Sequence, residues 1–414
     1  MTKIAVIGLG YIGLPTATIL AEKGFDVLGV DISPDVITTL KRGESHIVEP
    51  DLEESLSSVI QSGKLKVSLQ VSSADVFIIT VPTPFLDDYI PDLSYVESAT
   101  KEISKHLAPG NLVILESTCP VGSTEKVSEW IAKERSDLML PSRAGESASV
   151  NVAYCPERVL PGCIMYELVA NDRIIGGVSS KCTKQAVALY EEFVQGKCLA
   201  TNAATAEMAK LSENAFRDVN IAFANELSMI ASNQNVDIWE LIELANRHPR
   251  VNILKPGPGV GGHCIAVDPW FLINADKENT KLIQAARHVN DYKPEFILNQ
   301  VDKLIARIKE PTIACLGLAF KANIDDLRES PSLDICRKLA ANTSLKLNIV
   351  EPYINSMPAA LSDNKNVALT DVKTALEHAN LILLLVDHDQ FHSIPQKHNL
   401  DGKIVIDTRG IWNI

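Results

Sequence analysis

The amino-terminal segment constrains the fold more tightly than any other part of this 414-residue chain. An apolar run at residues 4–7 predicts a short buried strand, and the motif G-x-G-x-x-G follows it at Gly8, Gly10 and Gly13. A helical pattern and a second apolar run come next, and Asp31 closes that second run. This order is typical of the βαβ unit that binds a dinucleotide, in which an acidic residue stands about 20 positions after the glycines.

The chemistry of this unit predicts NAD rather than NADP. Glycines let the backbone approach a pyrophosphate, and the N-terminus of the following helix attracts the negative charge of that group. Asp31 can accept a hydrogen bond from a ribose hydroxyl and would repel a 2′-phosphate, and residues 32–34 carry no cation to offset that repulsion. The predicted cofactor site consists of Gly8, Gly10, Tyr11, Ile12, Gly13 and Asp31.

Charge and composition limit the classes of partner. The net charge of −13 argues against a nucleic-acid partner, because no basic block offsets it. The longest strongly apolar run, 381–386, is far shorter than a membrane span, and the N-terminus is predicted to be a strand and a helix rather than a signal peptide. Eight scattered cysteines without a C-x-x-C pair indicate reduced thiols, with neither a disulfide framework nor a metal site. We therefore expect a cytoplasmic protein.

The pattern along the chain changes twice, and the chain is long enough for two or three domains. Strands and helices alternate over residues 1–200, helical spacing dominates residues 201–300, and the alternation returns over residues 301–414. The predicted fold class is α/β, with two Rossmann-like doubly wound domains joined by a long central helical region.

Two buried strand runs of the first region lead to hydroxyl residues. The run at 76–81 is followed by Thr83, and the run at 112–115 is followed by Thr118. Ligands of doubly wound sheets bind beyond the carboxyl ends of the strands, so both threonines are candidate cofactor contacts. The alternative for each threonine is ordinary turn chemistry.

The central region begins with a helix predicted over residues 205–227. Lys210, Asn214 and Arg217 fall at positions i, i+4 and i+7, so they share one face. This face is either a solvated polar stripe or one side of a ligand site. A long helix between two α/β halves also suits a dimer interface.

Residues 257–271, with the sequence GPGVGGHCIAVDPWF, bring together glycines, a thiol and a carboxylate. The glycines permit positive φ and a close approach to a ligand. Cys264 ends the glycine-rich turn, and Asp268 follows four residues later, within reach of the same site if the segment coils. A thiol in this setting indicates a covalent nucleophile, and the alternative is a buried, inert cysteine.

The third region begins with a strand predicted at 312–316, which leads to Gly317. The second and third glycines of the dinucleotide motif are missing from this turn, so it is a poor NAD site. Lys321 and Arg328 follow the turn, and Arg409 comes after the last strand. Cations in place of glycines suit a phosphorylated ligand other than NAD.

Several motifs together give a resemblance that covers the whole chain. They are GLGYIGLP, VPTP, ESTCPVGSTE, AYCPERVLPG, EMAKLSENAFRDVNIAFANEL, GPGVGGHCIAVDPWF, GLAFKANIDDLRESPS and the terminal DTRG. The sequence resembles the UDP-sugar dehydrogenase family, and the segment NRHPRVNI is similar to the subgroup that acts on UDP-N-acetyl-D-mannosamine. The resemblance implies an N-terminal NAD domain, a central dimerisation helix and a C-terminal UDP-sugar-binding domain, assembled as a homodimer or a dimer of dimers.

The resemblance also implies a four-electron oxidation. The C6 hydroxyl of the sugar becomes a carboxylate with two NAD per turnover, for bacterial surface polysaccharides such as enterobacterial common antigen or capsule. Cys264 would form a thiohemiacetal and then a thioester that water cleaves. Lys210 and Asn214 would stabilise the negative oxygen at C6, and Lys210 could also accept the alcohol proton.

The remaining site residues are assigned by the same resemblance. Asp268 would act as a base or orient water, and Thr118 and Glu157 match positions that hold this water. Many relatives have a second glutamate where this chain has Pro161, and this departure puts a water network based on that carboxylate in doubt. The implied substrate contacts are Arg158, Val159, Lys210, Asn214, Arg217, His248, Arg250, Gly261, Phe320, Lys321 and Arg409, and Arg328 is implied at the cofactor.

Three alternatives stay open. The sugar could be N-acetylglucosamine or glucose, because stereochemistry is not visible in a sequence. A two-electron dehydrogenase of the 3-hydroxyacid or 6-phosphogluconate type shares the NAD domain and the helix, but it needs neither the cysteine nor a third domain. A catalytically silent regulator that binds NAD and a UDP-sugar is opposed by the intact set of Lys210, Asn214, Cys264 and Asp268.

Overall fold

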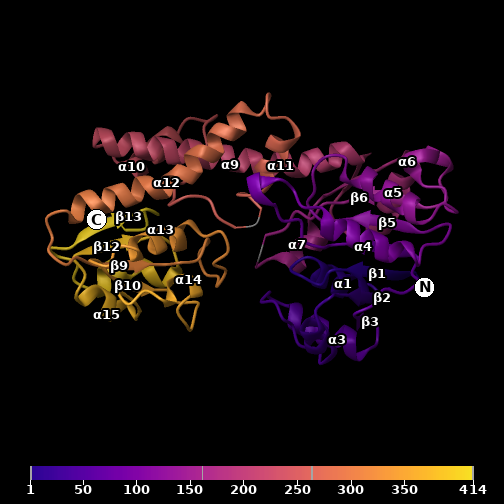
Figure 1. The fold of residues 1–414 in the computed structure, drawn as a ribbon, viewed down its shortest axis with the longest axis horizontal. Coiled ribbons are helices and arrows are strands. Elements are labelled where there is room, and N and C mark those ends of the chain that lie inside the picture. Colours follow the sequence, from indigo (N-terminus) through magenta and orange to yellow (C-terminus); the bar gives the residue numbers. More distant parts are fainter. Residues whose placement is uncertain (1, 161, 263, 413–414) are drawn as a thin grey trace. The chain divides into compact units, whose positions relative to one another are not determined.

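The computed structural model of the protein describes residues 2–160, 162–262 and 264–412 (Figure 1). The chain forms two compact units. The first consists of Met1–Ser212 and Trp270–Ala275, and the second of Glu213–Pro269 and Asp276–Ile414. The division after Ser212 falls within the region predicted to be helical, so that region contributes residues to both units.

Over its described residues, the first unit contains an eight-stranded sheet in the order β3-β2-β1-β4-β5-β6-β7-β8. The strands are β1 (Lys3–Ile7), β2 (Asp26–Val30), β3 (Leu65–Ser68), β4 (Val76–Ile79), β5 (Leu112–Leu115), β6 (Asn151–Tyr154), β7 (Arg173–Gly177) and β8 (Cys198–Asn202). Neighbouring strands are parallel except β6 and β7, which are antiparallel. The first six strands have the order 3-2-1-4-5-6 of a dinucleotide-binding sheet, which confirms the predicted doubly wound fold.

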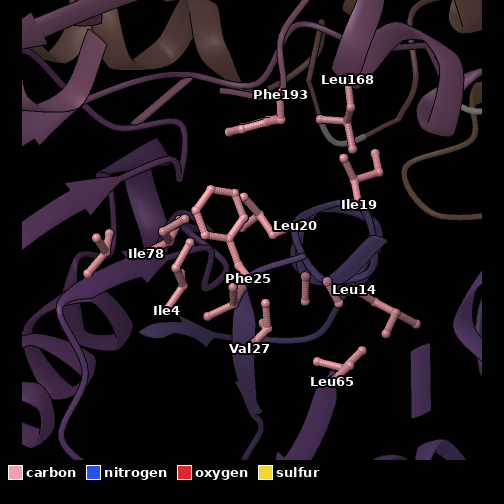
Figure 2. Close-up of a cluster of buried hydrophobic side chains, with 14 of the residues drawn as sticks. Ile4, Leu14, Ile19, Leu20, Phe25, Val27, Leu65, Ile78, Leu168 and Phe193 are labelled. Carbon is pink, nitrogen blue, oxygen red and sulfur yellow. The ribbon is translucent and has the colours of Figure 1, made fainter. Parts of the chain in front are cut away.

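Alternate side chains of β1 point to opposite faces of this sheet. Ile4 packs with Leu14, Leu20 and Phe25 in one buried cluster (Figure 2), whereas its neighbour Ala5 belongs to a second cluster. Helices supply the other side of each cluster. They are α1 (Gly13–Glu22), α2 (Pro34–Lys41), α3 (Leu52–Gln61), α4 (Ser94–Ser104), α5 (Ser123–Glu134), α6 (Pro141–Ala144), α7 (Ile164–Ala170) and α8 (Ser180–Tyr190), with 3-10 turns at Asp87–Tyr89 and Gly145–Ser147.

Helix α9 (Ala203–Gln234) follows β8 directly, and it is longer than the helix predicted over 205–227. Its residues up to Ser212 belong to the first unit and its later residues to the second. Helix α11 (Asp268–Ala275) is divided in the same way. The second unit also contains α10 (Ile238–Ala245) and α12 (Lys281–Ile305), which has Pro294 inside it.

The second sheet has five strands over the described residues, in the order β11-β10-β9-β12-β13. The strands are β9 (Thr312–Leu316), β10 (Lys346–Val350), β11 (Val367–Leu369), β12 (Leu381–Leu384) and β13 (Ile404–Asp407), and all neighbours are parallel. The helices around it are α13 (Pro331–Ala340), α14 (Ala359–Ser362), α15 (Val372–Glu377), α16 (Asp389–His392) and α17 (Ile394–Lys397). The strand order repeats that of the first sheet, which confirms a second Rossmann-like domain.

The first strand of each sheet ends in the same backbone turn. Gly8 and Gly317 both have a φ of +94°, a value that glycine adopts with little strain. Each amide donates a hydrogen bond of 2.8 Å to the last carbonyl of the neighbouring strand, from Gly8 to Val30 and from Gly317 to Val350. The two ligand loops therefore start alike.

The two loops then diverge. In the first unit, α1 starts at Gly13, where a Cβ atom would lie 1.8 Å from the carbonyl oxygen of Gly8, so only glycine fits. Ala322 stands at the same spacing in the second unit, and no helix starts there in the described residues. The loop continues until α13 begins at Pro331, capped by the Ser330 hydroxyl. As predicted, the second loop is not built as a dinucleotide loop.

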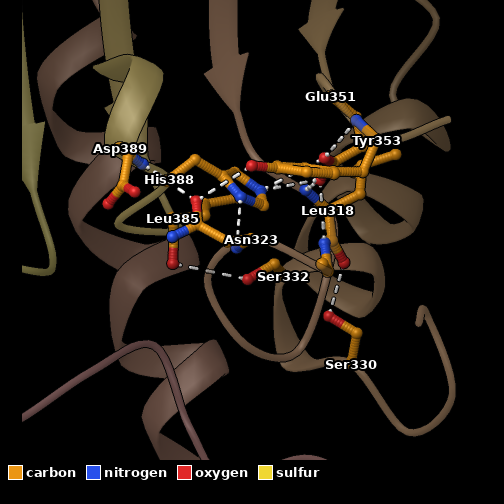
Figure 3. A network of polar contacts seen from close by, with 10 residues as sticks. Leu318, Asn323, Ser330, Ser332, Glu351, Tyr353, Leu385, His388 and Asp389 are labelled. Carbon is orange, nitrogen blue, oxygen red and sulfur yellow. Dashed lines mark hydrogen bonds and ion pairs between the residues drawn. The ribbon is translucent and has the colours of Figure 1, made fainter. Parts of the chain in front are cut away.

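A buried network holds the second loop in place (Figure 3). The Glu351 carboxylate accepts hydrogen bonds from the amides of Leu318 at 2.7 Å and Ala319 at 3.0 Å. His388 Nδ1 accepts from the Asn323 amide at 2.9 Å, so its proton lies on Nε2, which donates to Glu351. The Glu351 carboxylate, which follows β10, therefore holds the backbone of the loop after β9.

In the described part of the chain, every helix is too short or too polar to span a bilayer. The same residues contain no group of three histidines, cysteines or carboxylates that could hold a metal ion.

Candidate active site

The glycine loop of the first unit fits a dinucleotide. An added Cβ on Gly8 would lie 2.9 Å from the Thr80 carbonyl oxygen, and one on Gly13 would overlap Gly8, so both positions need glycine for packing within the protein. Gly10 is different, because an added Cβ there would meet no described atom within 4 Å. The open space beside Gly10 lets a pyrophosphate approach the backbone, as the NAD hypothesis requires.

The N-terminus of α1 is also suited to an anion. Its N-cap residue, Ile12, makes no side-chain capping bond, and the first turn contains no acidic residue. Nearby, the Tyr11 ring is partly exposed. Within the described residues, the positive end of the helix dipole is thus not neutralised by a carboxylate in the first turn.

Asp31 is held firmly at the end of β2. Its two carboxylate oxygens accept hydrogen bonds of 2.9 Å from the amides of Leu9 and Ser33. The next side chain, Ile32, is 88% exposed. A pre-positioned carboxylate beside an exposed apolar side chain suits a ribose and the adenine that it carries.

Thr83 and Thr118 lie together beyond the carboxyl ends of β4 and β5. The Thr83 hydroxyl donates a hydrogen bond of 2.6 Å to the Thr118 carbonyl, and the Ser117 hydroxyl donates one of 2.6 Å to the Val81 carbonyl. Both threonine side chains remain partly accessible. The loop hydrogen bonds of the turn interpretation are therefore present, and the contact of both threonines with a cofactor stays a prediction.

Glu207, a residue that the sequence did not single out, supports the Thr118 loop. Its fully buried carboxylate accepts from the Gly122 amide at 2.6 Å and from the Thr124 amide at 2.8 Å. It also accepts from the Thr124 hydroxyl at 2.6 Å. Glu207 thereby caps the N-terminus of α5 from α9, one turn before Lys210. The only sequence signal was its place in the EMAK motif.

The charge of Lys210 acts on Glu157 within the first unit. Lys210 is buried on α9, and Glu157 lies in the loop after β6. Burial raises the pKa of Glu157, while the charge of Lys210 and a hydrogen bond from the Val159 amide oppose that rise. Glu157 and Lys210 therefore lie close enough for their charges to interact.

A buried polar layer that the sequence did not reveal lies close to Glu157. The Tyr190 hydroxyl donates to the Glu116 carboxylate, and the Arg173 guanidinium lies 5.8 Å from the centre of the Tyr190 ring. Burial raises the pKa of the Cys155 thiol to about 12, so Cys155 is not a nucleophile. The charge of Arg173 also opposes the rise in the pKa of Glu157.

Arg158 and Val159 both make contacts within the first unit. Arg158 Nη1 donates to the Asp172 carbonyl at 3.4 Å, and the Arg158 carbonyl accepts from the Asn171 side chain at 3.1 Å. The Val159 side chain packs against the core cluster around Ile4. Pro161, where many relatives were expected to carry a second glutamate, lies outside the described residues.

The second unit brings together Asn214, Cys264 and Asp268. The Cys264 carbonyl accepts hydrogen bonds from the amides of Val267 at 3.1 Å and Asp268 at 2.9 Å, so the segment coils as the prediction required. The Asn214 side-chain amide donates to the Asp268 carboxylate. Asp268 is 3% exposed, whereas the Cys264 side chain is exposed. Cys264 is therefore not the buried cysteine of the alternative interpretation, and its role as a nucleophile stays a prediction.

The glycines before Cys264 make close contacts within the protein. A Cβ on Gly261 would lie 2.4 Å from the Glu329 carbonyl oxygen, and one on Gly262 would lie 2.8 Å from the Phe320 ring. A Cβ on Gly259 would lie 2.9 Å from Pro331. These glycines therefore let the cysteine loop pack against the loop after β9, and Phe320 forms part of that contact.

A buried amide network anchors the start of the cysteine loop. The Gly257 amide donates to Asn225 on α9 at 2.9 Å, and Asn225 donates to Asn290 on α12 at 2.9 Å. Asn290 donates in turn to Asp218, which also pairs with Arg287 at 2.6 Å. None of these four side chains was among the predicted site residues, although Asp218 and Asn225 follow that set on α9.

The predicted cations of the second unit have different surroundings. Arg328 pairs with Asp326 at 2.6 Å, and Arg409 pairs with Asp387 at 2.6 Å. Lys321 makes no side-chain hydrogen bond or ion pair with the residues that the structure describes. Lys321 is therefore the most available of the three for an anionic ligand.

Arg217, His248 and Arg250 lie on exposed parts of the second unit. Arg217 is on α9, one turn after Asn214, and the other two follow α10. The Arg250 amide lies 3.4 Å from His248 Nδ1, which accepts its hydrogen bond. The predicted site residues are thus divided, with Thr118, Glu157 and Lys210 in the first unit and Asn214, Cys264 and Asp268 in the second.

Comparisons with known proteins identify the family. The chain matches the models of the UDP-glucose/GDP-mannose dehydrogenase family, with the NAD binding domain at residues 2–194, the central domain at 204–292 and the UDP binding domain at 314–414. It is 54% identical over 410 residues to the NDP-N-acetyl-D-galactosaminuronic acid dehydrogenase of Ralstonia nicotianae, with 99% of this chain and 96% of the relative covered.

Two further relatives carry a different name. The UDP-N-acetyl-D-mannosamine dehydrogenase of Escherichia coli K12 is 52% identical over 417 residues, with 99% of each chain covered. The solved structure of the UDP-D-ManNAc dehydrogenase from Pyrococcus horikoshii has a TM-score of 0.89 at 41% identity, with 99% of this chain and 96% of that chain covered. On the strength of its sequence, its two Rossmann-like sheets and these matches, the chain belongs to the UDP-glucose/GDP-mannose dehydrogenase family.

Proposed function

We propose that the protein oxidises the C6 hydroxyl of UDP-N-acetyl-D-mannosamine to a carboxylate, with two NAD consumed per sugar. The observation that carries this proposal is the exposed thiol of Cys264, whose carbonyl is bonded to the Asp268 amide. Asp268 in turn accepts from Asn214. A two-electron dehydrogenase has no use for this set, whereas an oxidation from alcohol to acid needs a nucleophile to hold the aldehyde.

The first half of the reaction removes one hydride from C6 and one proton from its hydroxyl. NAD, when bound at the glycine loop, supplies the acceptor for the hydride. Lys210 stabilises the developing oxyanion or accepts the proton, and the second N–H of the Asn214 amide is a further donor to that oxygen. Removal of such a donor costs a factor of about 10²–10³ in rate.

The second half passes through a covalent adduct on Cys264. The thiolate adds to the aldehyde carbon to give the oxyanion of a thiohemiacetal, which loses its C6 hydride to a second NAD and becomes a thioester. Water then cleaves the C–S bond, which yields the carboxylic acid and restores the thiol. We assign Asp268 as the base or orienter for this water, with Thr118 and Glu157 as residues that hold it.

The relatives support a 2-acetamido sugar as the substrate. Two of them are named for UDP-N-acetylmannosamine, and another is named for an NDP-N-acetylgalactosaminuronic acid. That last name makes the galacto sugar a second candidate, beside UDP-N-acetylglucosamine and UDP-glucose. We assign the uridine diphosphate to the second unit through Lys321, Arg217 and Arg250.

The surface of α9 supports a homodimer or a dimer of dimers. Phe216, Phe223 and Ile230 follow one another at intervals of seven residues, so they form one stripe along the helix. They are 72%, 51% and 52% exposed. A stripe of large exposed apolar side chains marks a protein interface, and its regular spacing suits a second copy of the same helix.

The proposed setting is the cytoplasm of a bacterium, in the synthesis of surface polysaccharides. The eight cysteines, none of which forms a disulfide, suit a reducing compartment. The product is a nucleotide-linked uronic acid, a form in which a sugar can be passed to a glycosyltransferase.

The test is the number of NADH released per sugar. Wild-type protein with UDP-N-acetylmannosamine should release two NADH and form the uronic acid, and UDP-glucose should be a poorer substrate. Cys264→Ala should lose the covalent route while NAD binding is retained, and Cys264→Ser should be nearly as slow, because a hydroxyl is scarcely ionised at pH 7. Cys163→Ala, an exposed cysteine of the first unit, is the control. Two NADH per sugar at near wild-type rate from Cys264→Ala would refute the mechanism.

A further inference from the structure

The second unit contains a pocket that none of the proposed site residues lines. Its volume is about 280 Å³, close to the size of a small-molecule site. The walls come from α9, α10, α12 and the end of β13, and Pro256, which directly precedes the cysteine loop, completes them.

The principal feature of this pocket is the ammonium group of Lys293. The side chain is only 6% exposed, and its Nζ donates to the Ser228 hydroxyl, whose own proton goes to the Asn225 carbonyl at 2.6 Å. Nζ also lies 5.2 Å from the centre of the Phe296 ring. No carboxylate pairs with this ammonium among the residues that the structure describes, and two of its three donors have no acceptor among them.

A buried cation without a counter-ion is costly, because burial favours the uncharged form. The pKa of Lys293 is accordingly lowered by burial to about 8, so the group is still largely protonated at neutral pH. An anion in the pocket would offset this cost directly.

The rest of the lining suits an organic anion. Trp239 and Phe296 present partly exposed rings, and Ser232 and Gln300 form a polar rim, joined by a hydrogen bond of 2.9 Å. Asp407 also lines the pocket, but its carboxylate accepts from three backbone amides, including that of Gly410 at 2.7 Å. These amides hold the Asp407 carboxylate and partly offset its charge. Among the described residues that line the pocket, Asp407 is the one with a carboxylate.

The apolar stripe on α9 does not account for this pocket. Ser228 is five residues after Phe223, which is ~140° around the helix. A second copy that covers the stripe therefore meets another face of α9, and the pocket needs its own occupant.

We propose that this pocket is a second binding site, for a small organic anion whose charge pairs with Lys293 and whose apolar body packs against Trp239 and Phe296. The site is independent of the assigned reaction, and it adds a ligand that the oxidation chemistry does not require. Because Pro256 directly precedes Gly257, the occupant lies beside the anchor of the cysteine loop.

Benzoate and benzamide are the probes, because they share a ring and differ in charge. Both are titrated by calorimetry into the full-length protein, with UDP and NAD at saturating concentrations to fill the proposed active site. Benzoate should bind saturably at one site per chain, and benzamide should bind at least about tenfold more weakly, since its neutral amide cannot form an ion pair with Lys293. Equal binding of the two, or no saturable binding of benzoate at millimolar concentrations, would overturn the proposal.

Variants locate the site. Lys293→Met should weaken benzoate binding at least about tenfold. Lys303→Met, at an exposed position of the same helix, should leave it unchanged. Ser232→Phe fills the pocket from its exposed rim and keeps Lys293, so it should block benzoate even if Lys293→Met were to fold poorly. Undiminished binding in Ser232→Phe together with folded Lys293→Met would place the benzoate elsewhere and reject the pocket.

Discussion

The Asn214 side-chain amide donates a hydrogen bond to the Asp268 carboxylate, which joins α9 to the first residue of α11. The backbone amide of Asp268 also donates a hydrogen bond to the Cys264 carbonyl. The orientation of Asn214 is therefore set by a group that we assign to the chemistry.

Asp268→Asn should lower kcat by at least about 100-fold, because it removes a base and weakens the hydrogen bond that orients Asn214 by replacing a charged acceptor with a neutral one. The KM for the UDP-sugar should change far less. Steady-state kinetics measure both, with Glu278→Gln, at an exposed position of the second unit, as the control. In a double-mutant cycle, Asn214→Ala and Asp268→Asn should be strongly non-additive. Additive losses would mean that the two side chains act separately.

Asp31→Ala should reduce the preference for NAD over NADP. The variant loses a ribose acceptor and the acceptor for the Leu9 and Ser33 amides, so the KM for NAD should rise roughly 10- to 100-fold. Hydride transfer at saturating NAD should largely survive. Initial rates with both cofactors check this, and Asp35→Ala, at an exposed position nearby, should leave them unchanged. If the ratio of kcat/KM for NAD to kcat/KM for NADP did not change, Asp31 would not determine which cofactor is preferred.

Phe223→Glu should disrupt self-association. A charge in the middle of the apolar stripe should weaken the dimer at least about 30-fold, the loss expected for one central interface residue. Sedimentation velocity measures the oligomer, and circular dichroism shows whether the variant is folded. Tyr166→Glu changes an equally prominent exposed aromatic on α7 and should have no effect. A folded variant that remains fully dimeric would exclude α9 as the interface.

Lys293 should leave a signature in the pH dependence of stability. Burial lowers its pKa from the ordinary value of 10.5 to about 8 in the folded protein, so the unfolded chain holds one more proton between these values. Stability therefore rises with pH across this window, and the penalty from the buried charge is fully present below pH 8. Between pH 7 and pH 10.5, the free energy of unfolding of the wild type should rise by on the order of 3 kcal/mol relative to that of Lys293→Met. Urea titrations of both proteins at several pH values measure these free energies of unfolding. A difference between the two proteins that does not change with pH would contradict the prediction.

Local patterns in the sequence were sufficient to predict much of this fold. The glycine spacing after β1, the acidic residue after β2 and the missing glycines after Gly317 are properties of short segments, and the structure confirms the sheets that they imply. Cys264 and Asp268 could be paired for the same reason, since they are four positions apart in the sequence.

Contacts between distant segments could not be predicted in this way. Glu207 is 85 residues from Gly122, whose amide it holds, and nothing in one sequence marks that pairing. The approach of Gly261 and Gly262 to a ligand stays a prediction, but the packing of these glycines against Glu329 and Phe320 was not foreseen. Such roles depend on which segments meet after folding, and the pattern of apolar and polar residues does not determine them.

The two units have separate apolar interiors, with the clusters around Ile4 and Ala5 in the first and those around Ile313 and Ala314 in the second. Residues that share one apolar core unfold together, and these two units do not share a core. Heating this protein should therefore give two heat-absorption peaks rather than one. A ligand that binds only the native form of one unit raises the midpoint of that unit. Calorimetry with NAD alone and with UDP alone can therefore assign each nucleotide to its half of the chain without any turnover.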